Sequence, residues 1–445
     1  MAKDDQVQFA KIKEQVENFK RKTNDTTNRR ARLFKNLISF VMDGEQWSSN
    51  ETKERAGDGF SSLAFNFSED YVERYLARLF PRNPRTGVME VGTKVYEDTG
   101  DGEQLQQILD TYKTNDLPAT LLEQGTDFLV GGSACLYYPQ NIVTKEADIV
   151  SLDPTTVHLG WRGKKLSQFM FIEKFDDNSE KWTYWDLKKI VVIQGGEMTV
   201  EEHKMNFIPF SWIPSFPKPH THEGRSKVLS LYDLDREFNS VTSDFSKRVG
   251  DNTDPHLIVF SDEVDIDKIG RGRKKKTKLG KDDDMRFLEL KEGSEILDYT
   301  KDLEKIMRRK TGIIDSAGNI KSAVSGFSLA FQFSDMLDLI GFMRIFWDDA
   351  FRQMNEAILT YKFGPGEYKT DPVYHPAIMF DSKQRVDEYA VMLENDLISH
   401  KDAIDELRGV ENAEEKLNEI IAEKKLLKEN QDDNDDSGGQ GRSKD

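Results

Sequence analysis

The pattern of apolar residues predicts one helix that is longer and more apolar than the rest of the chain. It begins near Phe327 and carries apolar side chains almost without a break to Ile358. At 1.5 Å per residue, its roughly 35 residues span about 50 Å. Because apolar residues cover most of its circumference, we expect neighbours to enclose it on several sides. A single chain offers few ways to do so, whereas a ring of identical chains offers an easy one.

Two further helices and an insertion precede this long helix. In the first helix, which begins near Arg225, apolar residues recur at steps of three and four, the spacing of one helical stripe. They are Leu231, Leu234, Phe238, Val241, Phe245 and Val249. The insertion from Pro255 to Tyr299 opens and closes with strand-like segments, His256–Phe260 and Arg286–Leu290, the second followed by Ile296 and Leu297. Together these segments predict a strand–loop–strand unit held between two helices.

The N-terminal half is predicted to hold helices followed by a small antiparallel β unit. The helices cover residues 6–42, interrupted by the polar stretch Thr23–Asn28, then a segment with Ser68 as N-cap that Pro81 ends, and about Glu103 to Gly131. Short strand-like segments follow. They are Ala134–Tyr138, Val157–Gly160, Gln168–Lys174, Trp182–Trp185, Ile190–Gln194 and Ile208–Ile213, closed by the proline-rich connector Pro209–Pro219.

The C-terminal part is predicted to be helical and then disordered. The segment from Ser399 has a serine N-cap, an acid at its third helical position and a glycine just beyond its end, which together predict a short helix. Another covers about Glu411 to Lys428, and residues Gln431–Asp445 are rich in Asp, Asn, Gly and Ser, which is typical of disorder. The predicted fold class is therefore α+β and mainly helical.

Composition indicates a folded, soluble chain of roughly two to four structural units. Of its 445 residues, 37% are hydrophobic and 32% are charged. Cys135 is the only cysteine, so no intrachain disulfide can form and synthesis in a reducing cytoplasm is expected. The N-terminus carries charges where a signal peptide would need an apolar run. We expect no membrane span, because charged residues interrupt the long helix: Asp335, Asp338, Arg344, Asp348, Asp349 and Arg352.

The net charge of −17 argues against tight, sequence-independent binding of nucleic acid, which depends on neutralising phosphates. It is compatible with a surface past which nucleic acid slides without sticking. One basic run stands out, Lys268–Lys281, with Lys274, Lys275 and Lys276 at its centre. Such a block is favoured as a solvated or partner-facing loop tip. Contact with nucleic acid remains the alternative, since clustered lysine and glycine suit phosphate.

Signals of catalysis or of a bound cofactor are poor. Gly270 and Gly280 do not complete a phosphate-binding loop, because the Gly-x4-Gly-Lys-Ser/Thr spacing is absent. His220 and His222 lack further metal ligands at sensible spacing, and Cys135 falls in a predicted buried strand. His256 and His375 each lie beside proline, which is typical of packed loop residues. We therefore expect no enzyme, no metal and no cofactor.

The order of the predicted parts, together with several local sequences, resembles the portal proteins of tailed bacteriophages, over about residues 30–430. Gly131–Tyr138 followed by Leu152–Pro154 resembles the family's wing strand and its next turn. Gly224–Ser240 is similar to the start of its stem helix. Ser322–Phe331 resembles the segment that joins the channel loop to the long wing helix, and Ile398–Glu406 the entry to the crown.

The resemblance implies a portal fold with wing, stem, clip and crown parts that assembles into a ring. The implied parts are wing 1–224, first stem helix 225–252, clip 253–299, second stem helix 300–313, channel loop 314–326, long wing helix and return 327–380, crown helices 381–430 and tail 431–445. No long C-terminal helical extension follows, so we expect no barrel above the crown.

The resemblance also implies a function and partners. About twelve copies would form a ring at one capsid vertex of the virion, assembled in the host cytoplasm, through which double-stranded DNA enters and leaves. The ring would nucleate capsid assembly with major capsid and scaffolding proteins, dock the terminase large subunit, and later carry a head–tail adaptor. The side chains expected to face DNA are Asn319, Lys321, Ser322 and Ser325, between the pivots Gly318 and Gly326. An ordinary surface loop is the alternative for this segment.

A second function class stays open on the sequence alone. The Lys268–Lys281 run could serve a cytoplasmic nucleic-acid-binding enzyme. Tight, salt-dependent DNA affinity that is lost on replacing Lys274, Lys275 and Lys276 by alanine would favour that class.

Overall fold

The computed structural model describes residues 3–47, 51–52, 62–83, 87–96, 102–203, 205, 207–253, 257–260, 284–287, 294–312, 333–377, 389–395, 398–400, 403 and 421. The chain divides into two compact units. The larger unit, here called the main body, comprises Met1–Asp315 and Phe333–Ala377, and the second comprises Ser316–Gln332 and Ile378–Asp445. Helices and sheets occur together in the main body, which confirms the α+β class.

The helices of the main body are α1 (Lys3–Val41), α3 (Phe67–Leu79), α4 (Glu103–Thr114), α5 (Leu117–Val130), α6 (Leu229–Thr253), α7 (Ser294–Thr311) and α10 (Ser334–Phe363), with the short 3-10 turn η1 (Pro154–Thr156). The strands of its two larger sheets are β2 (Ser133–Tyr137), β3 (Val150–Ser151), β4 (Val157–Arg162), β5 (Lys165–Lys174), β6 (Glu180–Asp186), β7 (Lys189–Gln194), β8 (Glu197–Glu202) and β9 (Phe210–Pro214). Two further pairs are formed by β1 (Val91–Tyr96) with β12 (Lys369–Tyr374) and by β10 (Leu257–Phe260) with β11 (Asp284–Phe287). No helix among the described residues is both long and apolar enough to cross a membrane.

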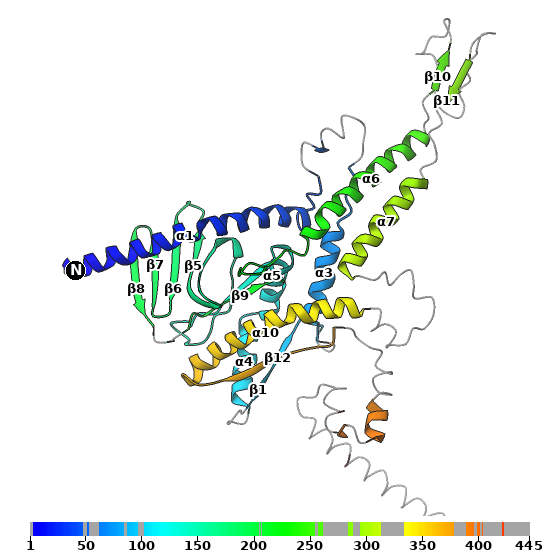
Figure 1. Ribbon diagram of the computed structural model, residues 1–445. Helices are drawn as coiled ribbons and strands as arrows, with labels where there is room; N and C mark the ends of the chain where they lie inside the picture. Colours follow the sequence, from blue (N-terminus) through cyan, green and yellow to red (C-terminus); the bar gives the residue numbers. More distant parts are fainter. Residues whose placement is uncertain are drawn as a thin grey trace, which may run out of the picture. The chain divides into compact units, whose positions relative to one another are not determined.

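Helix α1 runs unbroken along one face of a five-stranded sheet (Figure 1). The predicted interruption at Thr23–Asn28 is wrong, because two residues of this stretch, Thr23 and Thr27, face the sheet and find partners on it, while the others are solvated. The Thr23 hydroxyl lies 2.8 Å from Nδ1 of His158, and the Thr27 hydroxyl donates to the Val157 carbonyl at 3.2 Å. Burial, with Lys20 and Arg30 nearby, lowers the pKa of His158 to about 4, so the imidazole is neutral at physiological pH.

The strands predicted as one β unit form two antiparallel sheets. Strands β4 to β8 form a meander in sequence order, whereas β2 lies between β3 and β9 in a separate sheet. Strand β8 escaped prediction because only Met198 and Val200 are apolar there, and they pack beside α1 while the charged residues are solvated. The other face of the five-stranded sheet packs against β2 and β9 through Phe169 and Phe210, whose rings stack at 3.9 Å.

The predicted helix from Glu103 to Gly131 is two helices. They are α4 and α5, and the chain turns between them at Asp116, which has a left-handed φ of 46°. Pro118 then lies in the first turn of α5, a position that proline favours. Ser68 is also not the N-cap of α3. Asn66 caps that helix by accepting from the Glu69 amide, whereas Ser68 is buried and hydrogen-bonds to Asp235 of α6.

Helix α10 forms the centre of the main hydrophobic core. Met336, Ile340, Met343, Trp347 and Phe351 are buried along one stripe of the helix. The Trp347 ring meets Phe80 edge-on at 4.7 Å and Phe128 at 5.7 Å, so α3 and α5 enclose it from within the same chain.

The expectation that shelter would come mainly from sister chains is therefore wrong for the buried stripe, which its own chain covers. Exposed apolar residues remain on the opposite side, where Phe342 is 58% exposed and Ile345 54% exposed. Helix α10 begins at Ser334 with Phe333 as its N-cap, and residues 327–332 of the predicted helix lie outside the described residues.

In the second unit, few residues are described. The Ala403 amide donates to the Ser399 carbonyl at 2.9 Å, the bond of a first helical turn at the predicted N-cap. The predicted helix 411–428, apart from residue 421, and the tail 431–445 lie outside the described residues.

Candidate functional site

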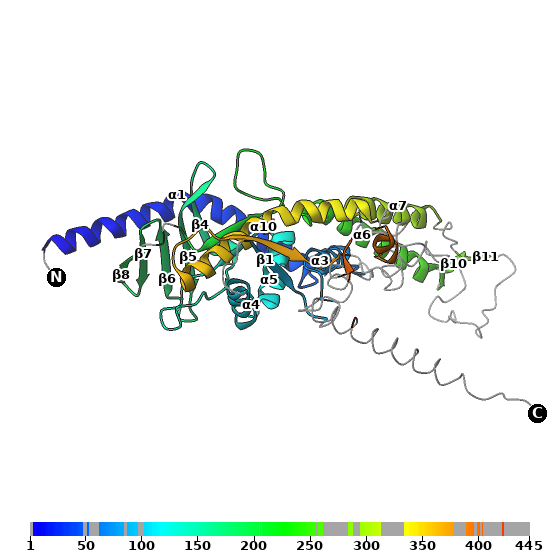
Figure 2. The same ribbon diagram turned by 90° about the horizontal axis from the view of Figure 1, so that it is seen from below.

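The two helices predicted to flank the insertion lie side by side, and α7 returns along α6 (Figures 1 and 2). Between them in the chain, β10 and β11 pair antiparallel, with Leu257 opposite Phe287 and Phe260 opposite Asp284. This confirms the two predicted strands in part: β11 begins at Asp284, two residues before the predicted start at Arg286, and residues 261–283 and 288–290 lie outside the described residues. Ile296 and Leu297 belong to α7, however, which begins at Ser294, earlier than expected.

A buried polar stripe on α6 binds the extended segment that leads into α3. Asp235, Asn239 and Ser243 recur every fourth residue, so they lie on one face of α6, and all three are fully buried. The Asp235 carboxylate accepts from the Ser68 amide at 3.0 Å and from its hydroxyl at 2.8 Å. The Ser243 hydroxyl oxygen accepts from the Leu63 amide at 3.0 Å.

Asn239, in the middle of the stripe, binds the Phe65 backbone as a neighbouring strand would. Its side-chain oxygen accepts from the Phe65 amide at 2.7 Å, and its amide donates to the Phe65 carbonyl at 3.1 Å. The same amide also donates to Oε1 of Gln46 at 3.1 Å. Phe238 on the adjoining face meets Phe65 and Phe67 edge-on, at 5.6 and 4.9 Å. These contacts fix α6 against the N-terminal part of the main body.

Sequence reasoning missed this stripe, although the spacing of Asp235, Asn239 and Ser243 was visible. Polar residues at every fourth position are also what a solvated helix face shows. Their partners, at residues 63–68, are mostly backbone groups, which carry no sequence signal.

The buried carboxyl of Asp235 gives the α6 attachment a pH dependence that can be measured. Burial raises the pKa of Asp235 to about 6, although the Ser68 hydrogen bonds oppose the shift. Since the folded-state pKa lies above the unfolded value of about 3.9, this residue's contribution is complete below pH 4 and is lost as the pH rises through 6. The free energy of unfolding should therefore fall by about 2 kcal/mol between pH 4 and pH 7 relative to an Asp235→Asn variant.

Urea unfolding of both proteins at the two pH values measures this difference. Asp233→Asn, on the exposed side of the same helix, is the matched control and should keep the pH dependence of the parent. Parallel pH profiles for the parent and Asp235→Asn would contradict the account.

Two of the sequence segments that carry the family resemblance meet where the chain enters α6. Gly132, just before β2, has a φ of 87°, and its carbonyl accepts from the Ser215 amide at 2.9 Å. A Cβ on Gly224 would lie 1.8 Å from that same carbonyl oxygen. The Arg225 amide then donates to the Ser215 carbonyl at 2.6 Å. The backbone approach explains why glycine stands at both positions.

The described residues on either side of the predicted channel loop, Gly312 and Met336, lie next to each other. Gly312 ends α7 with a φ of 65°, and a Cβ there would lie 3.4 Å from the Met336 amide nitrogen at the start of α10. The Tyr75 hydroxyl donates to the Thr311 carbonyl, which fixes this end of α7 to α3. The predicted residues themselves, Asn319, Lys321, Ser322 and Ser325, lie outside the described residues.

The two ends of the segment that contains the basic run are also held together. Phe260 and Asp284 are paired across β10 and β11, and residues 261–283 connect them. Lys274, Lys275 and Lys276 lie within this segment, outside the described residues.

Helix α7 carries many charges but is nearly neutral. Three of its cations pair with acids one turn earlier: Lys301 with Asp298 at 3.1 Å, Lys305 with Asp302 at 3.0 Å and Arg308 with Glu304 at 2.6 Å. Such exposed pairs contribute little to stability. Their relevance is that they leave few cations on this helix free to bind phosphate.

The structure places three of the residues considered for catalysis or metal binding, Cys135, His222 and His375. Cys135 is fully buried in β2, where burial raises the pKa of its thiol well above the usual range. The His222 ring stacks on Trp161 at 3.9 Å, and His375 lies 3.8 Å from Glu90. Within the described ranges, no group of three His, Cys, Asp or Glu could hold a metal ion. His256 lies outside these ranges.

Comparison with known proteins gives one match by sequence. A sequence model of the family described as "Phage portal protein, SPP1 Gp6-like" matches residues 89–434. Curated protein sequences give no match.

Among solved structures, the chain is similar to the neck of a native gene transfer agent (GTA) particle computed with C12 symmetry. Identity is 12% and the TM-score 0.49, over 83% of this chain and 98% of that one. It is also similar to the neck of an empty GTA particle computed with C6 symmetry, at 13% identity and a TM-score of 0.48, over 81% and 94%. Since the family match covers more than three quarters of the sequence, the chain belongs to the SPP1 Gp6-like family of phage portal proteins.

Proposed function

We propose that this chain is the subunit of a ring, of about twelve copies, that forms the portal at one capsid vertex and passes double-stranded DNA during packaging and ejection. The observation that carries the proposal is the family match over residues 89–434. In this assignment α6 and α7 form the stem, β10 and β11 belong to the clip, and residues 314–326 form the channel loop.

The geometry of the main body supports the channel-loop assignment. Gly312 and Met336 lie together, so the main body holds both ends of the intervening segment at one place, which supports a loop at this position. The anchoring of α7 to Tyr75, and of α6 to residues 63–68, gives that loop a rigid base.

The charge distribution also supports a channel. A wall along which DNA moves must not trap phosphates, since each fixed cation that pairs with a phosphate adds affinity. The net charge of −17 and the paired cations of α7 meet this requirement. The proposed grip on DNA then falls to the few polar side chains Asn319, Lys321, Ser322 and Ser325.

The partners in this proposal follow from the portal role. The clip would face the terminase large subunit during packaging and a head–tail adaptor afterwards, with the run Lys268–Lys281 at its tip. Major capsid and scaffolding proteins would assemble around the ring. The exposed apolar residues of α10, Phe342 and Ile345, would lie against a sister subunit.

A labelling experiment tests the channel loop. Cys135 is fully buried, so a cysteine introduced at an exposed site is the one that a bulky maleimide modifies. Rings carrying labelled Ser322→Cys should package several-fold less nuclease-protected DNA than unlabelled rings, in a reaction with the cognate capsid and terminase. Labelled Lys164→Cys, in the exposed β4–β5 turn, is the control and should package normally. Equal packaging by both labelled rings would contradict the assignment.

A further inference from the structure

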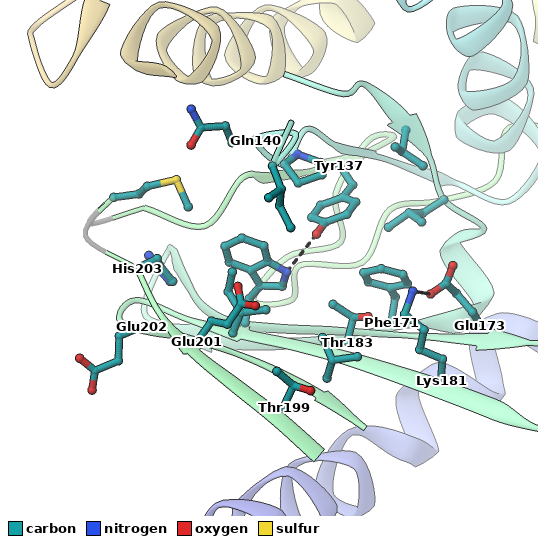
Figure 3. A pocket seen from close by; sticks show the side chains of 18 of the residues that line it. Tyr137, Gln140, Phe171, Glu173, Lys181, Thr183, Thr199, Glu201, Glu202 and His203 are labelled. Atoms are coloured by element: carbon teal, nitrogen blue, oxygen red, sulfur yellow. Dashed lines mark hydrogen bonds and ion pairs between the residues drawn. The ribbon is translucent and has the colours of Figure 1, made fainter. Parts of the chain in front are cut away.

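A pocket lies between the five-stranded sheet and the β2–β3 hairpin, on the face of the sheet opposite α1 (Figure 3). Its volume is about 520 Å³, within the range of ligand sites. Side chains of β7 and β8, including Val192 and Thr199, line the pocket on the sheet side, and the β2–β3 hairpin lines it on the other.

The inner wall of the pocket is aromatic and rigid. Tyr137, Phe171 and Trp185 pack together, with ring centroids of Tyr137 and Phe171 5.2 Å apart. The Trp185 indole N–H donates to the Tyr137 hydroxyl at 3.1 Å, which fixes both rings. A ligand entering the pocket therefore meets preformed apolar surface and does not have to order it.

Two polar atoms at the pocket have no partner within the described part of the chain. Thr183 is only 6% exposed, and its hydroxyl makes no hydrogen bond. In His203, Nε2 lies 2.8 Å from the Asp186 carbonyl, so this nitrogen must carry the hydrogen. Nδ1 is the ring's remaining site for a hydrogen bond, as an acceptor in this tautomer, and it too is buried without a partner among the described residues. A buried acceptor left without a donor is costly, which favours an occupant that supplies N–H groups.

The charges at the pocket favour a cationic occupant. Glu173 is neutralised by Lys181, which lies 2.8 Å away. Glu201 and Glu202, at the end of the pocket near His203, are exposed and form no ion pair with any described residue (Figure 3). Lys145 is the one other lysine among the lining residues that the structure describes. The unpaired carboxylates therefore outnumber the unpaired amines.

We propose that this pocket binds an arginine side chain of a partner protein. Its aliphatic stem would lie on the Trp185 and Phe171 rings, and its guanidinium would donate to His203 Nδ1 and to the Glu201 carboxylate. Arginine combines an apolar, stacking body with five fixed donors, which matches both walls of the pocket.

A protein is favoured over a free small molecule because apolar surface continues past the edge of the pocket. Ile142, at the edge of the pocket, is 77% exposed, and Val143 beside it, outside the lining, is 88% exposed. Aliphatic residues beside the arginine would cover them. The proposal concerns the sheet face alone, so it stands or falls independently of the channel assignment.

Fluorescence anisotropy of labelled pentapeptides with the full chain tests the proposal. The probes are Gly-Leu-Arg-Leu-Gly and the same peptide with citrulline, which keeps the shape of arginine but is neutral. The arginine peptide should bind saturably, and the citrulline peptide about tenfold more weakly. Glu201→Gln and His203→Phe should each weaken binding of the arginine peptide several-fold.

Glu197→Gln is the matched control, because Glu197 is exposed on the same strand, β8, but does not line the pocket. It should leave binding unchanged. Equal binding of both peptides, equal effects of Glu201→Gln and Glu197→Gln, or no saturable binding would overturn the proposal. Binding of free arginine amide as tight as that of the peptide would assign the pocket to a small molecule and would equally overturn it.

Discussion

Replacing Gly224 with alanine is expected to destabilise the chain by about 4 kcal/mol or more, enough to prevent folding of many proteins. The added Cβ would lie 1.8 Å from the Gly132 carbonyl oxygen and 2.5 Å from the Ser215 amide nitrogen. Both are backbone atoms, so no side chain can move aside. Relief of the clash would break the Ser215–Gly132 and Arg225–Ser215 hydrogen bonds that lead the chain into α6.

Gly341→Ala is the matched control for this prediction and should have the opposite sign. Gly341 lies within α10, and nothing is within 4 Å of the Cβ it would gain. Alanine there should raise the free energy of unfolding by about 0.5–1 kcal/mol through helix propensity alone. Urea unfolding of the two variants measures both effects. If Gly224→Ala were about as stable as the parent chain, the backbone at Gly224 could not approach the Gly132 carbonyl so closely.

Trp347→Ala should be the most destabilising truncation in α10, at about 3–5 kcal/mol. The side chain is fully buried against Phe80, Phe128 and Phe351, from α3, α5 and α10 itself. All of these contacts lie within one chain, so the loss should appear in the unfolding of isolated subunits and not only in assembly.

Phe342→Ala separates the two sides of the same helix. Because Phe342 is more than half exposed in the single chain, its removal should change subunit stability by less than about 0.5 kcal/mol. Under the ring proposal it should instead lower the yield of assembled rings. If Trp347→Ala left the unfolding of the subunit unchanged, α10 would not be the centre of the core.

The apolar pattern correctly predicted a helix at α10, but the prediction of its neighbours was wrong. Apolar residues on many sides of a helix indicate that it is buried, but they do not indicate whether the residues that cover it belong to the same chain. The partners of Trp347 come from α3 and α5, more than 200 residues earlier, so their proximity is a tertiary fact without a local signal.

Local errors had a similar cause. The polar stretch Thr23–Asn28 predicts a break in α1, but Thr23 and Thr27 find partners across the sheet in His158 and Val157. Tertiary contacts here overrode propensity. The break at Asp116 went unpredicted because no glycine marks its left-handed conformation.

The candidate site was predictable where it depends on the order of elements and unpredictable where it depends on backbone partners. The strand–loop–strand insertion between two helices followed from the apolar pattern alone. The attachment of Asp235, Asn239 and Ser243 to residues 63–68 could not be predicted, because its partners are mostly backbone amide and carbonyl groups, which every residue type carries.

Native mass measurement of the purified full chain tests the central claim most directly. The ring proposal predicts a closed species of about twelve times the 51.2 kDa chain mass, with a central hole visible by negative-stain electron microscopy. A chain that remained monomeric under all assembly conditions, as solitary particles without a hole, would contradict it.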